Sequence, residues 1–368
     1  MPAIKVLVVD DSALVRKMLT DLLTAEAGLE VAATAGTASQ AMAKLEQVKP
    51  DIITLDVEMP GTNGLDLLQE IRRLCPRLPI VMFSSLTQRG GATTLEALAR
   101  GATDYATKPS GAASREEALE HVRRELVPKL VALGKWAEKT QQHAAPPVPA
   151  VVKSGREEWR AAEILAVGCS TGGPNALIEL FSALPPAIPV PILIVQHMPP
   201  IFTKLLAERL TALGRVPVRE AVDGDLVEQG KGLIAPGGYH MRVVRRSGVA
   251  RVTLDQTAPV NSCRPAVDNL FESVADEFDA KTLALVMTGM GQDGLRGCER
   301  IRERGGQVVV QDEASSIVWG MPGFVARAGL AHAVLPLPSL ASEVLARVGR
   351  GRTAGSGVTR SVEHSNVR

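Results

Sequence analysis

The chain has 368 residues, 45% of them hydrophobic, which is long enough to bury the cores of two or three domains. Its 41 Lys and Arg residues nearly balance its 40 Asp and Glu residues, so nothing in the overall charge argues for nucleic acid or a membrane surface as a partner. No apolar stretch approaches the roughly 20 residues of a membrane span, so we expect no direct membrane insertion. The four cysteines form no CxxC pair and no leader segment is recognisable, so we expect a reduced, cytoplasmic location.

The first 133 residues alternate short Val, Ile and Leu runs with amphipathic stretches, which predicts an α/β domain. The apolar runs predict strands at 4–11, 30–36, 51–57, 79–85 and 104–108. The amphipathic stretches predict helices at 14–23, 39–48, 64–74, 93–101 and 116–126. Strands and helices in this alternation form a doubly wound, five-stranded parallel sheet with helices on both faces.

The rest of the chain divides into a linker, a second domain and a tail. Residues 134–160 contain clustered prolines and predict an interdomain linker. Residues 161–349 predict a second, Rossmann-like α/β domain, interrupted by a β-hairpin insertion that turns at Ser247 and Gly248. Its expected strands are 163–168, 191–196, 216–221, 232–237, 282–289, 307–312 and 332–336, and its expected helices are 175–184, 202–213, 265–278 and 294–305. Residues 350–368 predict a basic flexible tail, and we expect Arg347 to be solvated close to it.

Chemically active residues stand at the strand ends of the first domain. Asp10 and Asp11 end the first predicted strand and Asp56 ends the third, so three carboxylates would meet at one sheet edge. Clustered carboxylates raise one another's pKa unless a divalent cation neutralises them, and oxygen ligands suit Mg²⁺. Ser84 closes the fourth strand and Lys108 the fifth, which completes the set that an aspartyl phosphate needs. For any one of these carboxylates, capping of a helix is the simpler interpretation.

These residues closely resemble the response-regulator receiver family, whose fold is a flavodoxin-like five-stranded sheet. The matching segments are Asp10-Asp11-Ser12, Leu55-Asp56-Val57-Glu58-Met59-Pro60-Gly61 with Gly64, and Thr107-Lys108-Pro109. The resemblance implies Asp56 as the phosphoacceptor and Lys108 as the partner of the phosphate. It also implies Ser84 and Tyr105 as switch positions. The implied Mg²⁺ ligands are Asp10, Asp11, Asp56 and the backbone of Glu58.

Three apolar runs in the second domain each end in a different catalytic residue type. The runs lead to Ser170, His197 and Asp293. These residue types can act as a nucleophile, a base and a residue that orients the base. Because ligands bind at the carboxyl ends of strands in open parallel sheets, hydrolysis is the leading hypothesis. The glycine-flanked Ser170 also fits a helix cap or a phosphate cradle. Of the base candidates His197, His240 and His332, the first is favoured because its strand directly follows the Ser170 unit.

The segment Gly289-Met290-Gly291-Gln292-Asp293-Gly294 supports a competing hypothesis. It follows a predicted strand, opens a helix and precedes a strand that ends in Asp312, which satisfies the sequence form of a dinucleotide-binding fingerprint. A receiver-regulated oxidoreductase that uses nicotinamide or flavin is therefore the alternative. It does not account for Ser170 or His197.

The second domain closely resembles the catalytic domain of the chemotaxis protein-glutamate methylesterases, the CheB family. The matching segments are Gly168-Cys169-Ser170-Thr171-Gly172-Gly173, Gln196-His197-Met198, Ala235-Pro236-Gly237-Gly238-Tyr239-His240, Arg264-Pro265-Ala266-Val267-Asp268 and Met287-Thr288-Gly289-Met290-Gly291-Gln292-Asp293-Gly294. A receiver joined to this domain is also that family's arrangement.

The resemblance implies hydrolysis of glutamate γ-methyl esters on methyl-accepting chemoreceptors and deamidation of receptor glutamines. It implies a histidine kinase as the phosphodonor and no cofactor in the catalytic domain. Ser170 would attack the ester, His197 would transfer the proton and Asp293 would hold the imidazole. Backbone N–H groups near Thr171 and Met290 would stabilise the oxyanion.

The domain order suggests control by blocking, in which the unphosphorylated receiver covers the crevice and phosphorylation of Asp56 favours an open form. A non-catalytic output module that binds DNA or a protein partner is a third hypothesis. The 3% of aromatic residues and the lack of a basic recognition helix give it little support.

Overall fold

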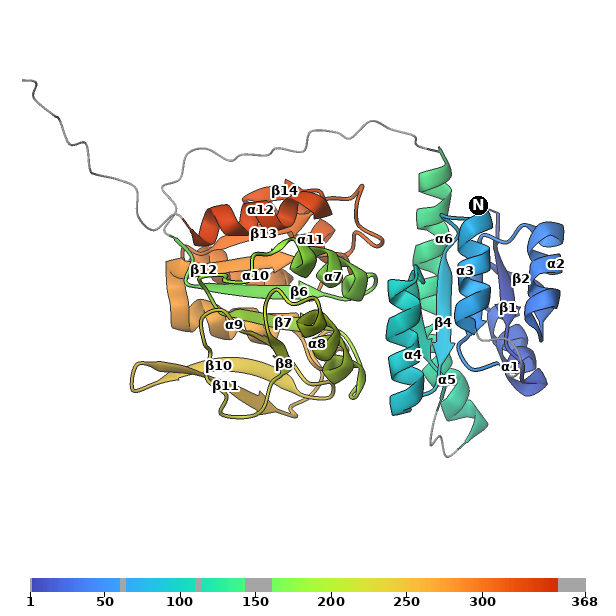
Figure 1. The fold of residues 1–368 in the computed structure, drawn as a ribbon, viewed down its shortest axis with the longest axis horizontal. Coiled ribbons are helices and arrows are strands. Elements are labelled where there is room, and N and C mark those ends of the chain that lie inside the picture. The colour runs from blue at the N-terminus through green and yellow to red at the C-terminus, as the bar shows by residue number, and fades with distance from the viewer. Residues whose placement is uncertain (1, 60–63, 110–113, 143–160, 350–368) are drawn as a thin grey trace, which may run out of the picture.

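The computed structural model describes residues 2–59, 64–109, 114–142 and 161–349, which form two α/β units side by side (Figure 1). The first unit holds a parallel sheet in the order β2-β1-β3-β4-β5. Its strands are β1 (Ile4–Val9), β2 (Leu29–Ala35), β3 (Ile52–Asp56), β4 (Ile80–Ser84) and β5 (Asp104–Thr107). This order confirms the predicted doubly wound, five-stranded receiver fold.

Alternate residues of the interior strand β1 face two different cores. Val6 and Val8 pack with one cluster, which includes residues of α1 (Ala13–Thr24), α5 (Arg115–Glu125) and α6 (Val127–Gln142). Leu7 and Val9 belong to the other cluster, which includes residues of α2 (Ala38–Val48), α3 (Gly64–Leu74) and α4 (Gln88–Ala99). Both faces of the sheet are therefore covered, as strands that are apolar throughout require.

The helix α6 occupies the start of the expected linker. Leu126, Leu130 and Leu133 are fully buried at helical spacing, and they continue the helix past residue 133. The helix therefore runs across the expected limit at 133–134, and Ala137 in its next turn is still buried. The rest of the expected linker, 143–160, and the expected tail, 350–368, lie outside the described residues.

The second unit holds a seven-stranded parallel sheet in the order β14-β13-β12-β6-β7-β9-β8. Its strands are β6 (Ile164–Cys169), β7 (Ile192–Gln196), β8 (Val218–Glu220), β9 (Gly232–Ile234), β12 (Thr282–Val286), β13 (Gln307–Gln311) and β14 (Ala333–Leu335). One face packs against α7 (Gly173–Ala183), α8 (Phe202–Ala212) and α12 (Leu337–Val348). The other face packs against α9 (Val267–Phe278), α10 (Leu295–Glu303) and α11 (Met321–Arg327).

The predicted hairpin insertion is present as β10 (His240–Arg246) and β11 (Val249–Asp255). Ser247 and Gly248 form its turn with φ of 51° and 81°, as a tight two-residue turn with both residues in the left-handed region requires. The apolar side chains of Met241, Val243 and Val252 pack in the same core as α9. The hairpin thus packs against α9.

Two C-terminal helices, α11 and α12, were not predicted. Each carries a proline in its first turn, and both pack through buried apolar residues. Arg347 lies in α12 with 3% of its surface exposed and pairs with Glu343 at 2.6 Å, so the expectation that it is solvated is wrong. A short 3₁₀ turn (Asp279–Lys281) completes the unit. In the described part of the chain, no helix has both the length and the apolar character to cross a bilayer.

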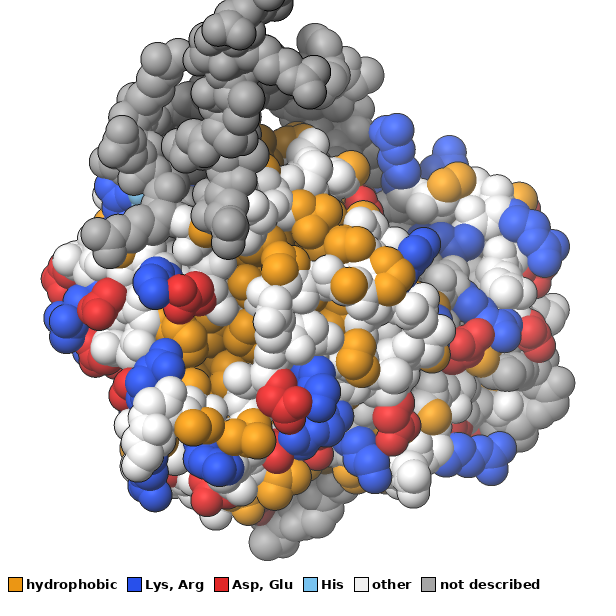
Figure 2. Space-filling model, turned by 60° about the vertical axis from the view of Figure 1, so that its left-hand side comes forward, with side chains coloured by type: hydrophobic (Ala, Val, Ile, Leu, Met, Phe, Trp, Pro, Cys, Tyr) orange, Lys and Arg blue, Asp and Glu red, His pale blue; other side chains and the backbone are white. Residues whose placement is uncertain are grey.

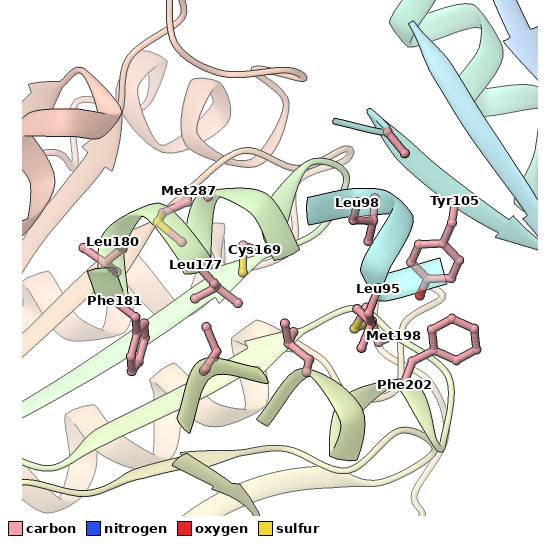
Figure 3. Packing of buried hydrophobic residues seen from close by; sticks show 14 of the residues in the cluster. Leu95, Leu98, Tyr105, Cys169, Leu177, Leu180, Phe181, Met198, Phe202 and Met287 are labelled. Atoms are coloured by element: carbon pink, nitrogen blue, oxygen red, sulfur yellow. The ribbon is translucent and has the colours of Figure 1, made fainter. Parts of the chain in front are cut away.

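The two units meet along α4, which packs against α7 and α8 (Figure 1). The buried cluster of apolar residues runs from Leu95 and Leu98 of α4 to Leu177 and Phe202 in the second unit (Figure 3). The face of the molecule drawn in Figure 2 carries basic, acidic and apolar side chains.

Candidate active site

Three adjacent strands bring the predicted catalytic residues to one edge of the second sheet. Ser170 directly follows β6, His197 directly follows β7, and Asp293 lies in the loop between β12 and α10. The strand β6 pairs with β12 on one side and with β7 on the other. The predicted convergence of the three side chains at the carboxyl edge therefore fits the sheet order.

His197 and Asp293 are in direct contact, with 2.8 Å between Nε2 and Oδ2. Asp293 is buried, and its carboxylate also accepts hydrogen bonds from the backbone N–H groups of Val267 at 2.6 Å and Asp268 at 3.1 Å. Burial by itself raises the pKa of Asp293, but the hydrogen bond and positive charge of His197 and these two backbone donors outweigh it and lower the pKa. Asp293 is therefore held as an anion that orients the imidazole.

The other ring nitrogen of His197 contacts a residue outside the predicted triad. Cys263 Sγ lies 3.4 Å from Nδ1, and no hydrogen bond joins Ser170 to His197 among the described residues. Burial by itself lowers the pKa of His197, but the charges and hydrogen bonds of Cys263 and Asp293 outweigh burial and raise the pKa from 6.5 to about 10. The resting arrangement thus favours the protonated imidazole.

The turn that carries Ser170 is fixed by its backbone. Ser170 N–H donates to the carbonyl of Thr288, and the carbonyl of Ser170 accepts from Gln196 Nε2 at 3.0 Å. Gly289 is required beside it, because a Cβ there would lie 2.9 Å from Cβ of Ser170 and against Met321. The backbone N–H groups of Thr171 and Met290 donate to no described residue.

The helix α10 begins in the glycine-rich segment that supported the dinucleotide hypothesis. The carboxylate of Asp268 accepts from the N–H of Gly294 at 2.9 Å and from the N–H of Gly297 at 2.8 Å. Burial, with the charge of Asp293 as a further cause, raises the pKa of Asp268 to about 6. These N–H groups are therefore already bound by a side chain, whereas a pyrophosphate would require them free. The dinucleotide alternative gains no support from this geometry.

The remaining base candidates lie in other hydrogen-bond networks. His240 Nδ1 accepts from the N–H of Ala266 at 3.2 Å, and its Nε2 lies 3.1 Å from the carbonyl of Ala258. His332 Nδ1 accepts from the N–H of Val308 at 2.9 Å. Neither contacts Asp293.

A carboxylate cluster lies at the carboxyl edge of the first sheet, as predicted. Carboxylate oxygens of Asp10, Asp11 and Asp56 lie within 4.8 Å of one another. Lys108 Nζ lies 2.9 Å from Asp10 Oδ2 and 2.9 Å from Asp56 Oδ2. Burial raises the pKa of Asp56 to about 6, although the hydrogen bond and charge of Lys108 oppose this rise.

This cluster fits a hard divalent cation. Its three carboxylates face one ammonium group, and the Oδ2 atoms of Asp10 and Asp56 accept no hydrogen bond apart from their contact with Lys108. Glu58 N–H donates to Asp56 Oδ1 at 3.1 Å, which fixes the loop after β3 beside the cluster. Oxygen donors with excess negative charge are the set that Mg²⁺ prefers.

The two predicted switch positions of the first unit lie toward α4 and the second unit. Ser84 is buried, and its hydroxyl donates to the carbonyl of Gly90 at 3.2 Å in α4. The ring of Tyr105 stacks on Phe202 of α8, with centroids 4.9 Å apart and planes within 6° (Figure 3). Phe202 lies five residues after His197, so Tyr105 is linked by packing to the segment that carries the predicted base.

Three residues that the fold brings to the site had no predicted role. Cys263 contacts His197, Asn261 Nδ2 donates to Asp293 Oδ1 at 3.1 Å, and Asp268 holds the start of α10. Asp268 lies in a segment that carried the family resemblance, which was the available signal for it. Cys263 and Asn261 precede that segment and follow no periodic pattern, so no local signal marked them.

A doubly wound receiver fold joined to an α/β unit with serine, histidine and aspartate at one sheet edge is the architecture of a response regulator with an enzymatic output domain. Family models support both halves. The response regulator receiver domain matches residues 6–120, and the CheB methylesterase model matches residues 165–344.

Full-length relatives extend the match to nearly the whole chain. A protein-glutamate methylesterase/protein-glutamine glutaminase of Trichodesmium erythraeum is 48% identical, over 95% of this chain and 100% of that protein. A protein of the same name from Nocardioides sp. is 44% identical, over 96% of this chain and 97% of that protein. The crystal structure of the Thermotoga maritima CheB methylesterase catalytic domain is 39% identical with a TM-score of 0.50, and covers 50% of this chain and 98% of that domain. The chain belongs to the CheB methylesterase family, which confirms the resemblance seen in the sequence.

Proposed function

We propose that this chain hydrolyses γ-methyl esters of glutamate side chains on chemoreceptors, releases methanol and also deamidates receptor glutamines. The names of its full-length relatives support the reaction and the substrate class. The observation that carries the proposal is the convergence of Ser170, His197 and Asp293 at the ends of β6, β7 and β12. The proposed location is the cytoplasm, where free cysteines stay reduced.

In the proposed mechanism Ser170 is the nucleophile and His197 is the general base. Because Asp293 holds Nε2 of the imidazole, the proton of Ser170 passes to Nδ1 as the bond from Oγ to the ester carbon forms. The same proton then moves to the methoxy oxygen as the bond from carbon to that oxygen breaks, and methanol leaves. A water molecule repeats the two steps on the acyl-enzyme. A glutamine substrate follows the same path with ammonia as the leaving group.

The oxyanion of the tetrahedral intermediate would bind the N–H groups of Thr171 and Met290. Both groups lie in loops at the carboxyl edge of the sheet and donate to no described residue. A preorganised donor of this kind lowers the barrier by roughly 3 kcal/mol in comparable sites. This arrangement needs no cofactor in the catalytic unit.

We propose that a histidine kinase phosphorylates Asp56 in the first unit. Mg²⁺ held by Asp10, Asp11, Asp56 and the backbone of Glu58 would neutralise charge on the phosphoryl oxygens. Lys108 would pair with the same oxygens, because its ammonium already lies between Asp10 and Asp56. Ser84 and Tyr105 would transmit the effect of phosphorylation toward α4.

We further propose that the unphosphorylated first unit limits access to the esterase site. The contact between α4 and α8, with Tyr105 stacked on Phe202, supports this control because it adjoins the loop of His197. Phosphorylation would shift the population toward a state in which this contact is released.

Methanol release from methylated chemoreceptor tests the proposed chemistry. We expect Ser170→Ala to lose at least about 1,000-fold in kcat, because no other side chain replaces the nucleophile. Ser182→Ala is the matched control, since Ser182 is an exposed serine of α7 whose hydroxyl donates to the carbonyl of Ile178, and we expect an unchanged rate. A Ser170→Ala protein that releases methanol at the wild-type rate would exclude the proposed nucleophile.

A further inference from the structure

Both ring nitrogens of His197 are occupied, and only one of the partners belongs to the proposed triad. Asp293 contacts Nε2 at 2.8 Å and Cys263 contacts Nδ1 at 3.4 Å. An ionised carboxylate can only accept, so Nε2 is the donor nitrogen and Nδ1 of the neutral ring is the acceptor. The nitrogen that must take the proton of Ser170 is therefore the nitrogen that Cys263 contacts.

We infer that the Cys263 thiol competes with the Ser170 hydroxyl for Nδ1 of His197, so that Cys263 is a positioning residue that controls when the base is available. The inference rests on the proposed function, because it takes Ser170 and His197 as nucleophile and base. In the blocked state one proton lies between Sγ and Nδ1. In the competent state Sγ keeps that proton, Nδ1 is free of it, and the hydroxyl of Ser170 donates to Nδ1.

A strained turn holds Cys263 in this place. The backbone groups of Val260 and Cys263 exchange two hydrogen bonds, at 2.8 and 3.1 Å, around Asn261 and Ser262. Both central residues have positive φ, 51° and 62°, in the region that favours glycine. Such strain in non-glycine residues persists where the surroundings impose it, and it is common at functional sites. The same turn directs Asn261 to Asp293 and Cys263 to His197.

The charges around His197 favour the blocked state. Cys263 and Asp293 raise the pKa of His197 to about 10 although burial opposes this. Asp268 lies behind Asp293 and shares Asn261 with it as a donor. The neighbouring Arg264 is directed away, since its guanidinium donates to the carbonyls of Gln256 and Thr257. Near neutral pH the proton therefore stays on the imidazole, and Cys263 is the group that holds it at Nδ1.

The pH dependence of kcat/KM for methanol release distinguishes this role from a structural one. In Cys263→Ala we expect the acid limb of the profile to move to lower pH by about one unit. The gain in kcat/KM over wild type is then about tenfold at pH 6.5 and falls to about threefold at pH 9.5. Cys75→Ala, which removes a half-buried thiol of the first unit, should leave the profile unchanged. An equal fractional change at every pH would overturn the inference.

The reactivity of the thiol gives a second measurement that does not depend on esterase activity. Iodoacetamide should alkylate Cys263 of the full chain at pH 7 about tenfold more slowly in His197→Asn than in wild type, because the variant loses the Nδ1 atom that lies 3.4 Å from Sγ and can take its proton. Peptide mass spectrometry resolves the sites, and the buried Cys169 and Cys298 react only if the variant unfolds. Equal alkylation rates in a folded variant would overturn the inference. Failure of the proposed function would instead appear as no methanol release by wild-type protein.

Discussion

At the scale of single residues, Asp268 shows how a side chain outside the triad supports the site. Its carboxylate accepts from Gly294 and Gly297 at the start of α10 and from Asn261 at 2.9 Å. We expect Asp268→Ala to lower the free energy of unfolding by about 3 kcal/mol, because buried N–H donors at the start of α10 lose a charged acceptor. Urea unfolding with the esterase rate measured in parallel tests this.

Glu299→Ala is the control for that substitution, since Glu299 is an exposed acid on the same helix. Its removal should change the free energy of unfolding by less than about 0.5 kcal/mol. If the two variants unfold at the same urea concentration, the Asp268 carboxylate does not stabilise the start of α10 in the way described.

At the scale of elements, the contact between α4 and α8 can be opened without touching either site. A Cβ on Gly91 of α4 would lie 3.0 Å from Leu205 and 3.7 Å from Phe202, so the helices approach closely only because position 91 has no side chain. We expect Gly91→Arg to separate the helices and to raise the esterase rate of unphosphorylated protein severalfold toward the phosphorylated rate.

Ala92→Arg is the matched control, because Ala92 is the next residue of α4 and is exposed. It adds the same charge and volume on a solvated face, so its basal rate should equal that of wild type. Small-angle scattering of both variants would show whether the units separate. An unchanged rate in a separated Gly91→Arg protein would exclude blocking by the first unit.

At the scale of the whole molecule, the proposed control links two sheet edges that lie in different units. We expect a small-molecule phosphodonor with Mg²⁺ to raise the esterase rate of wild type, and EDTA to abolish the rise, because the carboxylate cluster needs a cation. Asp56→Asn should not respond, whereas Asp66→Asn, an exposed acid in the first turn of α3, should respond like wild type. A response of Asp56→Asn equal to wild type would show that phosphate acts elsewhere.

The limits of the two domains are also a property of the whole molecule. The strands of the two sheets lie within the predicted ranges 1–133 and 161–349, and α6 continues past the first range to residue 142. Their exact limits, and the roles of the linker and the tail, stay predictions. Proteolysis that cuts first between 143 and 160 would agree with them.

Local sequence was sufficient for the strands and for most of the chemistry. Runs of Val, Ile and Leu separated by amphipathic stretches indicate burial on both faces of a sheet. A parallel sheet and the positions of Asp56, Ser170 and His197 at strand ends could therefore be anticipated. The family resemblance added the roles of the receiver residues. Short helices such as α11 were not predicted, because seven residues show too little of the apolar periodicity that marks a helix.

The sequence by itself determined which residue types stand at the ends of which strands, because the period of the apolar pattern is a local property of the chain. Only the tertiary structure decided that Cys263 lies against Nδ1 of His197, that Asp268 occupies the N–H groups of α10, and that Tyr105 stacks on Phe202. Each of these contacts joins segments far apart in the chain, so it depends on how turns and helices pack and leaves no periodic trace in the sequence.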